Sequence, residues 1–457
     1  MSRPNVLLLT IDTLRADRLG DHGGSQTVTP NLDRLASSGI RFDQAITGGS
    51  WTQAAFPVML TSTYASMHGG CLGPLSAGRP SPVEALSAHD YATAAFVTSP
   101  LLGRAYGYQR GFDHFSELMP EGKDPFLRRI KGGERLLRHT LTHQVAGLIG
   151  RSLRPGQLYV EAEQANQDVC NWLESVRQPF FGWVHYMDVH WPYHLESALD
   201  SPEGAAQAWQ DVAHLYRVNW RGEAISKSQR DRYLDLYDQA IRYVDAQVGE
   251  LLHCLDQAGL GDNTVIIAVS DHGEEFLERG HWGHVETNLY DEIIRVPLII
   301  HVPGEAGGLT VDRQVRTLDL MPTILELCDC PAPAGMEGVS LTPLWAGSDA
   351  DYDGSVAISE RWRDIGDVSH IVAVRTESFK YIWDAYQPDR SKLYDLNADP
   401  AEKINLVPDC PEIVRDLHPQ VEALLRKVAA TRSEISGIEP ELDPATIKRL
   451  RDLGYVE

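Results

Sequence analysis

The stretch VIIAVSDHGEEFLERGHWGH, residues 265–284, begins with a mostly apolar segment that runs directly into Asp271 and His272. A short apolar run of this kind is typical of a buried strand. Four more side chains that bind protons or metal ions follow in the same loop: Glu274, Glu275, His281 and His284. Buried charges are costly unless a cation or hydrogen bonds compensate them. The stretch therefore predicts a functional site at the end of a buried strand.

Other apolar runs that end in polar residues recur along the chain. Together with 264–272, the predicted strands are 5–12, 92–99, 180–188 and 296–304, and stretches with helical periodicity lie at 30–39, 159–176 and 230–259. This alternation predicts an α/β fold with a parallel sheet covered by helices on both faces. Ligands bind beyond the carboxyl ends of such strands. Because Asp12, Asp188 and Asp271 each end one of these runs, we expect them to converge on one edge.

The sequence changes character after about residue 350. Short strand-like runs occur at 355–360, 369–384 and 392–396, and a helical pattern follows at 411–432. We therefore predict a catalytic domain over residues 1–350 and a C-terminal subdomain over 351–457, with short antiparallel strands and a packed helix.

The composition narrows the class of protein. Of 457 residues, 43% are hydrophobic and 23% charged, and the net charge is −23, which argues against nucleic-acid binding. No window approaches the roughly 18 apolar residues of a membrane span. The N-terminal apolar run is too short, and too soon followed by Asp12, to be a signal peptide. Six scattered cysteines predict free thiols in a reducing cytoplasm.

One segment departs from the acidic balance. Residues 123–154 carry eight basic residues against two acids, with Leu and Ile at helical intervals. This pattern predicts a basic helical insertion within about 120–160. The segment either packs on its own protein, as a cap or a contact between subunits of a homo-oligomer, or makes peripheral contact with a membrane or lipid. The sequence favours packing.

The strand-end acids suggest a metal site. Asp12 offers a hard oxygen ligand, although a lone Asp at such a position is more often a helix N-cap. Asp271 and His272 are harder to explain as structural residues, because so many polar groups crowd the same loop. The three residues together would hold a cation and leave one position open for substrate.

Two further stretches carry candidate chemistry. Residues 185–194, HYMDVHWPYH, place Asp188, His190 and His194 just past a strand, where an imidazole can bind an anionic oxygen or protonate a leaving group. Residues 48–70 contain several hydroxyls, any of which a metal could activate as a nucleophile. Without context none of these hydroxyls can be selected.

The sequence as a whole resembles the sulfatase family of the alkaline phosphatase superfamily. The matching stretches follow one another along nearly the whole chain: 4–20, 29–47, 50–70, 107–115, 185–194, 263–275, 289–304, 317–327, 392–406 and 448–457. The resemblance implies an alkaline-phosphatase-like sandwich with a central mixed, mostly parallel sheet between helices.

The resemblance also assigns roles by position. Asp12, Asp271 and His272 match metal ligands, and Thr13 stands where many sulfatases have a second Asp. His190 matches the substrate-contacting His of the family's H-x-P-Y element, which continues here to Tyr193, so the resemblance implies that both residues bind the substrate. His284 lies where relatives place a Lys or His near the anionic oxygens of the substrate.

The nucleophile position departs from the sulfatase pattern. Family sulfatases carry C/S-x-P-S-R, whose first residue becomes formylglycine, whereas residues 52–56 here read TQAAF. Thr52 cannot form that aldehyde, and Phe56 replaces the arginine. A threonine at this position resembles other superfamily members, in which a Thr hydroxyl attacks phosphorus. A sulfated Thr has no exit equivalent to re-forming an aldehyde, whereas water can attack a phosphorylated Thr in line at phosphorus.

We therefore expect a metal-dependent hydrolase of small anionic esters, phosphate mono- or diesters ahead of sulfate esters. Thr52 would be the nucleophile, and His190 or His284 the proton donor. Calcium is usual for the family, but the imidazole of His272 also admits manganese or zinc. The alternative is a non-catalytic relative that binds an anionic ligand or a partner, since the arginine is lost.

Overall fold

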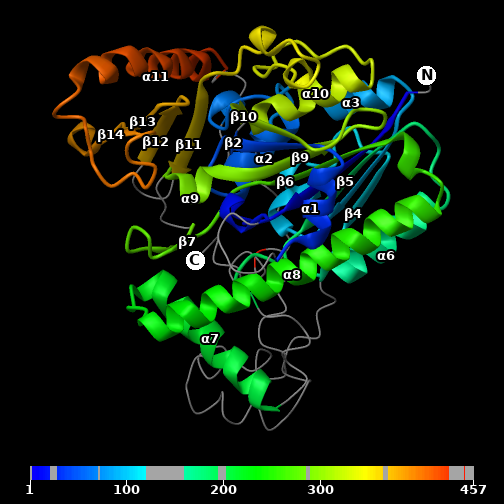
Figure 1. Ribbon diagram of the computed structural model, residues 1–457, viewed down its shortest axis with the longest axis horizontal. Helices are drawn as coiled ribbons and strands as arrows, with labels where there is room; N and C mark the ends of the chain where they lie inside the picture. Colours follow the sequence, from blue (N-terminus) through cyan, green and yellow to red (C-terminus); the bar gives the residue numbers. More distant parts are fainter. Residues whose placement is uncertain are drawn as a thin grey trace.

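The computed structural model describes residues 3–20, 28–69, 73–119, 159–193, 202–284, 289–363 and 369–431, together with Ile447 (Figure 1). The basic segment 123–154 therefore lies outside the described residues, as does His194. Among the helices of the described ranges, none is long and apolar enough to cross a membrane.

An eight-stranded sheet forms the centre of the molecule, in the order β10-β2-β9-β6-β1-β5-β3-β4. Its strands are β1 (Asn5–Ile11), β2 (Ile40–Ile46), β3 (Ala92–Val97), β4 (His114–Glu117), β5 (Phe180–Tyr186), β6 (Thr264–Ser270), β9 (Arg295–His301) and β10 (Leu309–Arg316). Only β9 runs against its neighbours β2 and β6; the other pairings are parallel. The sheet is thus mixed and mostly parallel.

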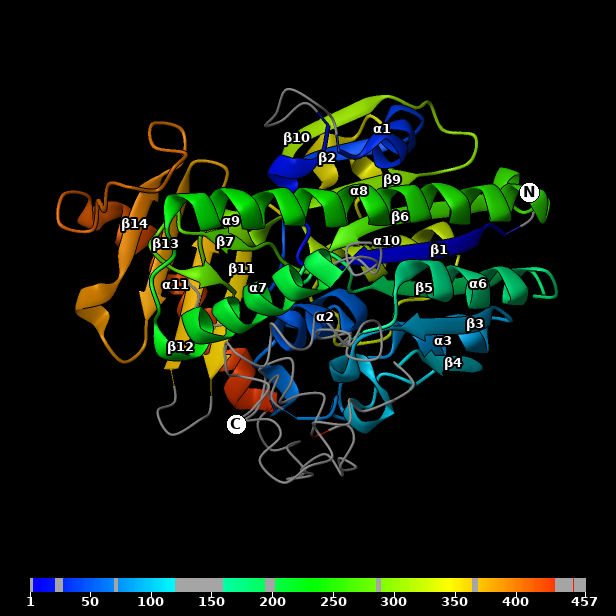
Figure 2. The same ribbon diagram turned by 90° about the horizontal axis from the view of Figure 1, so that it is seen from below.

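Helices cover both faces of this sheet (Figures 1 and 2). On one face lie α2 (Thr52–Thr61), α3 (Pro82–Ala88) and α10 (Leu320–Leu327); on the other lie α1 (Pro30–Ser37), α6 (Ala162–Leu173) and α8 (Lys227–Gln257). Alternate residues of β1 enter the two cores: Val6 and Leu8 face the first, Leu7 and Leu9 the second. A strand apolar on both faces can lie only in the interior, which explains its continuous hydrophobic run.

Two helices stand outside these layers. The helix α7 (Pro202–Arg221) contacts the short hairpin of β7 (Glu275–Phe276) and β8 (Trp282–Gly283), and α9 (Asp291–Ile294) leads into β9. The hairpin follows β6 directly, so it lies at the carboxyl end of the parallel strands.

The C-terminal region forms a second, antiparallel sheet covered by one helix. It contains β11 (Ala357–Arg363), β12 (Ser369–Arg375), β13 (Phe379–Asp384), β14 (Lys392–Asp395) and α11 (Pro411–Thr431). A backbone hydrogen bond of 2.9 Å from Glu360 to Gly48 joins this sheet to the segment just before α2. The C-terminal subdomain therefore contacts the chain close to Thr52.

Most sequence predictions of the fold are confirmed. All five predicted strands and the three predicted helices of the main domain form, as do the C-terminal strands and helix. The structure adds β2, β4 and β10, which are short or partly exposed and lack a continuous apolar run. It also shows that β9 is antiparallel, a direction that hydrophobicity does not encode.

The prediction that all cysteines are free thiols is wrong for two of them. Cys170 of α6 and Cys254 of α8 form a disulfide, because the packing of the two helices brings together residues 84 positions apart. Cys328, Cys330 and Cys410 are free, and Cys71 lies outside the described residues.

Candidate active site

The predicted ligand set lies at the carboxyl ends of two adjacent strands. Asp12 follows β1 and Asp271 follows β6, and these strands pair in parallel with Ile11 opposite Ser270. One ligand atom each from Asp12, Asp271 and His272 lies within 4.8 Å of the other two. His272 Nε2 is 3.8 Å from Asp12 Oδ1 and 3.4 Å from Asp271 Oδ2. The parallel register thus brings together the three residues, which we call the acidic cluster.

The free atoms of the acidic cluster suit a divalent cation. Both oxygens of Asp12, Oδ2 of Asp271 and Nε2 of His272 are buried and have no hydrogen-bond partner. His272 Nδ1 lies 2.9 Å from the carbonyl oxygen of Gly273, to which it donates, so the lone pair of the ring is on Nε2. Two buried carboxylates without partners are costly. A cation bound between them would remove that cost, so the residues fit such an ion.

The pKa values of the two carboxyl groups diverge. Burial would raise the pKa of Asp12, but the imidazoles of His185, His190 and His272 outweigh it and hold that pKa below its ordinary value. Burial, reinforced by the charge of Asp12, raises the pKa of Asp271 to about 7. Asp271 Oδ1 accepts hydrogen bonds from the backbone of Thr13 and His272, at 3.2 and 2.9 Å. Asp12 is therefore charged near pH 7, whereas Asp271 needs a counter-ion to be fully charged there.

Two more predicted histidines lie beside the acidic cluster. The ring centroid of His284 is 4.4 Å from that of His272 and 5.1 Å from that of His190. His284 Nδ1 is 3.0 Å from Glu274 Oε1, and the Tyr193 hydroxyl donates to Glu274 Oε2 at 3.1 Å. Burial lowers the pKa of His284 to about 4 and also lowers that of His190. Both imidazoles are therefore neutral near pH 7 and able to accept a proton.

Thr52 is the first residue of α2 and is fully buried, with no hydrogen-bond partner for its hydroxyl. The N-terminus of a helix carries partial positive charge, which favours an oxyanion there. One turn further, Phe56 packs edge-on against His185 with ring centroids 5.2 Å apart. His185 Nε2 in turn lies 3.5 Å from Asp12 Oδ2. These contacts join the helix of Thr52 to the acidic cluster.

Asp188 serves a structural purpose in this structure. Its Oδ1 accepts a hydrogen bond of 3.1 Å from the backbone of Ala162, the first residue of α6. Burial raises the pKa of Asp188 to about 7. Of the other polar residues in the loop after β6, Glu275 accepts hydrogen bonds from the backbone of Arg279 and His281, which closes the hairpin.

The sequence predicted no role for His185 and no partners for Glu274. His185 lies inside β5, where it reads as an ordinary strand position, and only pairing with β1 places it beside Asp12. Glu274 was noticed among the crowded polar groups, but its link to Tyr193 and His284 depends on a fold that joins three separate segments. For His185, the sequence signal was its position one residue before the end of β5.

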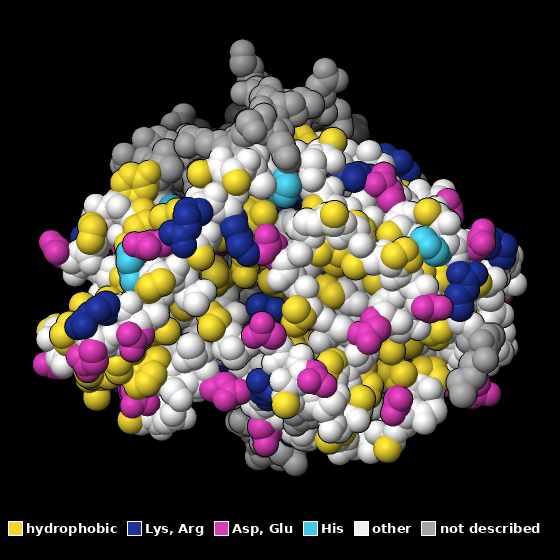
Figure 3. Space-filling view, turned by 90° about the horizontal axis from the view of Figure 1, so that it is seen from above, with side chains coloured by type: hydrophobic (Ala, Val, Ile, Leu, Met, Phe, Trp, Pro, Cys, Tyr) yellow, Lys and Arg dark blue, Asp and Glu magenta, His cyan; other side chains and the backbone are white. Residues whose placement is uncertain are grey.

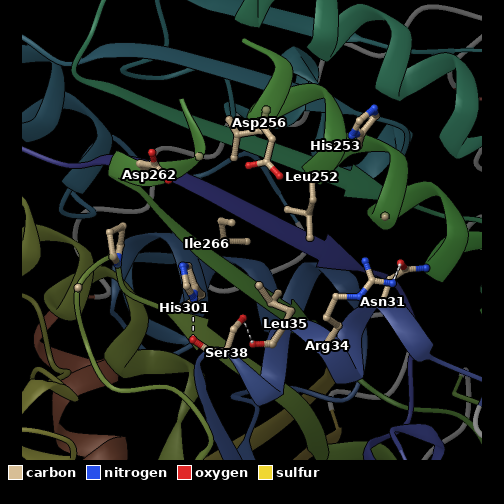
Figure 4. Close-up of a pocket in the computed structure, with 15 residues that line it drawn as sticks. Asn31, Arg34, Leu35, Ser38, Leu252, His253, Asp256, Asp262, Ile266 and His301 are labelled. Carbon is tan, nitrogen blue, oxygen red and sulfur yellow. Dashed lines mark hydrogen bonds between the residues drawn. The ribbon is translucent and has the colours of Figure 1, made fainter. Parts of the chain in front are cut away.

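A separate pocket of about 440 Å³ lies at the opposite end of the sheet (Figure 4). No residue of the acidic cluster lines this pocket, whose lining includes Asn31, Arg34, Leu252, His253, Asp256 and His301. The pocket lies at the amino ends of the parallel strands, because it is lined by Ile266 near the start of β6 and by His301 at the end of the antiparallel β9. On the face shown in Figure 3, acidic and basic side chains are interspersed.

The fold and this site agree with the comparisons to known proteins. The family model described as Sulfatase matches residues 4–330, and a model described as N-sulphoglucosamine sulphohydrolase, C-terminal, matches residues 280–427. The chain belongs to the sulfatase family, within the alkaline phosphatase superfamily, and is a hydrolase of the sulfuric or phosphoric ester class.

Individual relatives extend over most of the chain. An arylsulfatase of Clostridium perfringens is 26% identical, covering 89% of this chain and 90% of its own. Among solved structures, a phosphonate monoester hydrolase of Agrobacterium radiobacter has a TM-score of 0.73 at 22% identity, covering 93% and 96% of the two chains. A structure described as a putative sulfatase from Bacteroides thetaiotaomicron has a TM-score of 0.69 at 19% identity, covering 97% and 96%. These structures share the fold.

Proposed function

We propose that this chain hydrolyses small anionic esters, phosphate mono- or diesters ahead of sulfate esters, with Thr52 as nucleophile and a divalent cation held by Asp12, Asp271 and His272. The observation that carries the proposal is the set of buried, partnerless atoms in the acidic cluster, together with the partnerless hydroxyl of Thr52. Polar atoms are rarely buried without partners unless a ligand completes them.

The cation would supply positive charge that lowers the pKa of a bound hydroxyl and stabilises charge on the ester oxygens. Calcium, manganese and zinc all accept carboxylate oxygens, and the imidazole of His272 favours manganese or zinc over an all-oxygen calcium site. The protein itself holds the two carboxylates at the ends of adjacent strands and fixes the tautomer of His272 through Gly273.

The side chains then account for the movement of protons. The Thr52 oxygen attacks phosphorus, forming a Thr–O–P bond while the bond to the departing alkoxide breaks. A neutral imidazole, His284 or His190, takes up the hydroxyl proton and returns it to that alkoxide. Glu274 Oε1 lies 3.0 Å from Nδ1 of His284 and fixes the orientation of that ring. Water subsequently attacks phosphorus and the Thr–O–P bond breaks; one proton of that water passes to the Thr52 oxygen and restores the hydroxyl. Tyr193 acts through Glu274, and His190 also contacts the substrate.

The residues of the site favour an ester of phosphorus over an ester of sulfur as the substrate. Thr52 lacks the aldehyde exit that a formylglycine provides, so an ester on Thr52 must be cleaved at the central atom. The fold shared with phosphonate monoester hydrolase supports chemistry at phosphorus, whereas the relatives in sequence carry the name sulfatase. Sulfate esters therefore remain the companion substrate class to be tested.

The decisive experiment compares Thr52→Ala with Thr52→Ser and with Thr93→Ala, a buried threonine at the start of β3. Each variant is assayed on aryl phosphate, phosphodiester, phosphonate and sulfate esters, with and without chelator, and its metal content is measured. Thr52→Ala should lower turnover by more than about a thousandfold at unchanged metal content, because a lost nucleophile is not replaced. An active alanine variant would refute the assignment.

A non-catalytic role in binding an anionic ligand or a partner is the second candidate. It is favoured by Phe56, which fills with an apolar ring the position where the family has arginine. A protein that binds metal but turns over none of the four ester classes, even at high enzyme concentration, would support this role.

A further inference from the structure

We propose that His185 is a positioning residue for the metal site: its Nε2 faces Asp12 Oδ2 at 3.5 Å and would donate to that oxygen when Asp12 holds a cation through Oδ1. The inference rests on the cation site of the proposed function but not on turnover. His185 lies within β5 and opens the stretch 185–194, but the sequence analysis assigned it no role there.

The two oxygens of Asp12 face two different imidazoles. Oδ2 is 3.5 Å from His185 Nε2, while Oδ1 is 3.8 Å from His272 Nε2. All three side chains are fully buried. The atoms that lie within 4.8 Å of one another belong to Asp12, Asp271 and His272, and His185 is not a member of that set. His185 therefore contacts the ligand Asp12 rather than the space between the ligands.

The ring of His185 is held from behind by its neighbour across the sheet. Thr10 of β1 pairs with His185 of β5, and Thr10 Oγ1 is 3.1 Å from His185 Nδ1. The indole of Trp183 donates to the same hydroxyl oxygen at 3.0 Å, so that oxygen already accepts a hydrogen bond. The Thr10 proton is then available for His185 Nδ1 or for the carbonyl oxygen of Val184, which is 3.2 Å away.

The proposal assigns one tautomer to His185: with the Thr10 hydroxyl donating to Nδ1, the ring proton lies on Nε2, the atom that faces Asp12. Phe56 closes the remaining side of the ring with its edge-on contact. A carboxylate held by a donor on one oxygen presents the other in a fixed direction, and removing such an outer partner typically lowers metal affinity by about 10–100-fold.

The test uses metal binding rather than activity. His185→Gln places an amide N–H near the position of Nε2, whereas His185→Phe keeps a ring without a donor. Apoprotein of each variant is titrated with Mn²⁺ in competition with a chelator. We expect His185→Phe to weaken binding by about 10–100-fold and His185→Gln to stay within about threefold of the parent. His89→Phe, altering a partly buried histidine at the C-terminus of α3, is the matched control.

A second variant, Thr10→Val, tests the same contact in case His185→Phe does not fold. It removes only the hydroxyl behind His185, and we expect a smaller loss of Mn²⁺ affinity in the same direction, with the melting temperature of each apoprotein recorded alongside. Unchanged Mn²⁺ affinity in folded His185→Phe would overturn the inference. Equal losses in His185→Gln and His185→Phe would also overturn it, because a glutamine nitrogen can donate but cannot replace an imidazole that ligates the metal directly.

Discussion

At Asp12 and Asp271 the same residue type behaves in opposite ways. Both carboxyl groups are fully buried, but only Asp12 has enough imidazole contacts to keep its pKa low. Asp271 has its pKa raised to about 7 by burial and by the charge of Asp12. The identity of these two residues was predictable from their positions after apolar runs. The difference between their pKa values was not predictable, because it depends on three histidines that other segments bring close to Asp12.

This difference predicts a pH dependence of metal binding. A proton on Asp271 competes with the cation, so Mn²⁺ affinity of the apoprotein should fall by about tenfold per pH unit below about pH 7 and level off above it. The measurement is a chelator competition between about pH 5.5 and 8.5. Asp271→Asn should bind weakly and lose this step. A parent affinity that does not change across the range would contradict the shift.

The metal-free protein should show the opposite trend in stability. The folded pKa of Asp271 lies above its ordinary 3.8, so its contribution to stability is present at low pH and lost as pH rises through about 7. The pKa values of Asp188 and Glu274, also raised to about 7 by burial, act in the same direction, whereas the lowered pKa of Asp12 changes stability only below its ordinary 3.8. Stabilisation by added cation, read from the melting temperature, should therefore be larger at about pH 8 than at about pH 6.

Among the secondary-structure elements, continuous apolar runs predicted strands reliably because such runs are stable only in the interior of a covered sheet. The edge strands β4 and β10 and the partly exposed β2 lack that pattern. Pairings between helices were likewise hidden: α6 and α8 were each predicted, but not that they pack together and carry paired cysteines.

The disulfide between α6 and α8 can be tested by counting thiols. With Cys170 and Cys254 joined, two fewer cysteines should react with a thiol reagent under denaturing, non-reducing conditions than after reduction. The Cys170→Ser variant should lose about 2–4 kcal/mol of unfolding free energy, since the bridge restricts a long loop of the unfolded chain. Six reactive thiols before reduction would contradict the pairing. Cys410→Ser is the matched control, because Cys410 is free.

For the whole molecule, the main sheet and the C-terminal subdomain are joined by a buried ionic group. Lys380 of β13 is fully buried and lies 2.7 Å from Glu402 Oε1 and 2.5 Å from Asp291 Oδ1. Asp291 begins α9, which follows the loop of His284 in the chain. The contact therefore connects the C-terminal sheet to the side of the molecule that carries the site.

Replacing Lys380 by Met should be strongly destabilising. The substitution removes the nearest cation of the buried Glu402, while Asp291 keeps its pair with Arg375; breaking a buried pair in this way typically costs about 3–5 kcal/mol. Lys427→Met is the matched control, because Lys427 pairs with Glu337 at the surface and such pairs contribute about 0–1 kcal/mol. Both are measured by denaturant unfolding. Equal losses in the two variants would show that the buried group contributes no more than a surface pair.

The sequence by itself determined the fold class, the strand ends that carry Asp12, Asp271 and His272, and the departure at Thr52, because these depend on local hydrophobic pattern and on residue identity. Only the tertiary structure decided that β9 is antiparallel, that Cys170 and Cys254 meet, and that His185 and Glu274 stand behind the acidic cluster. Such features depend on strand register and helix packing, which bring distant segments into contact. No local pattern in the chain records those contacts.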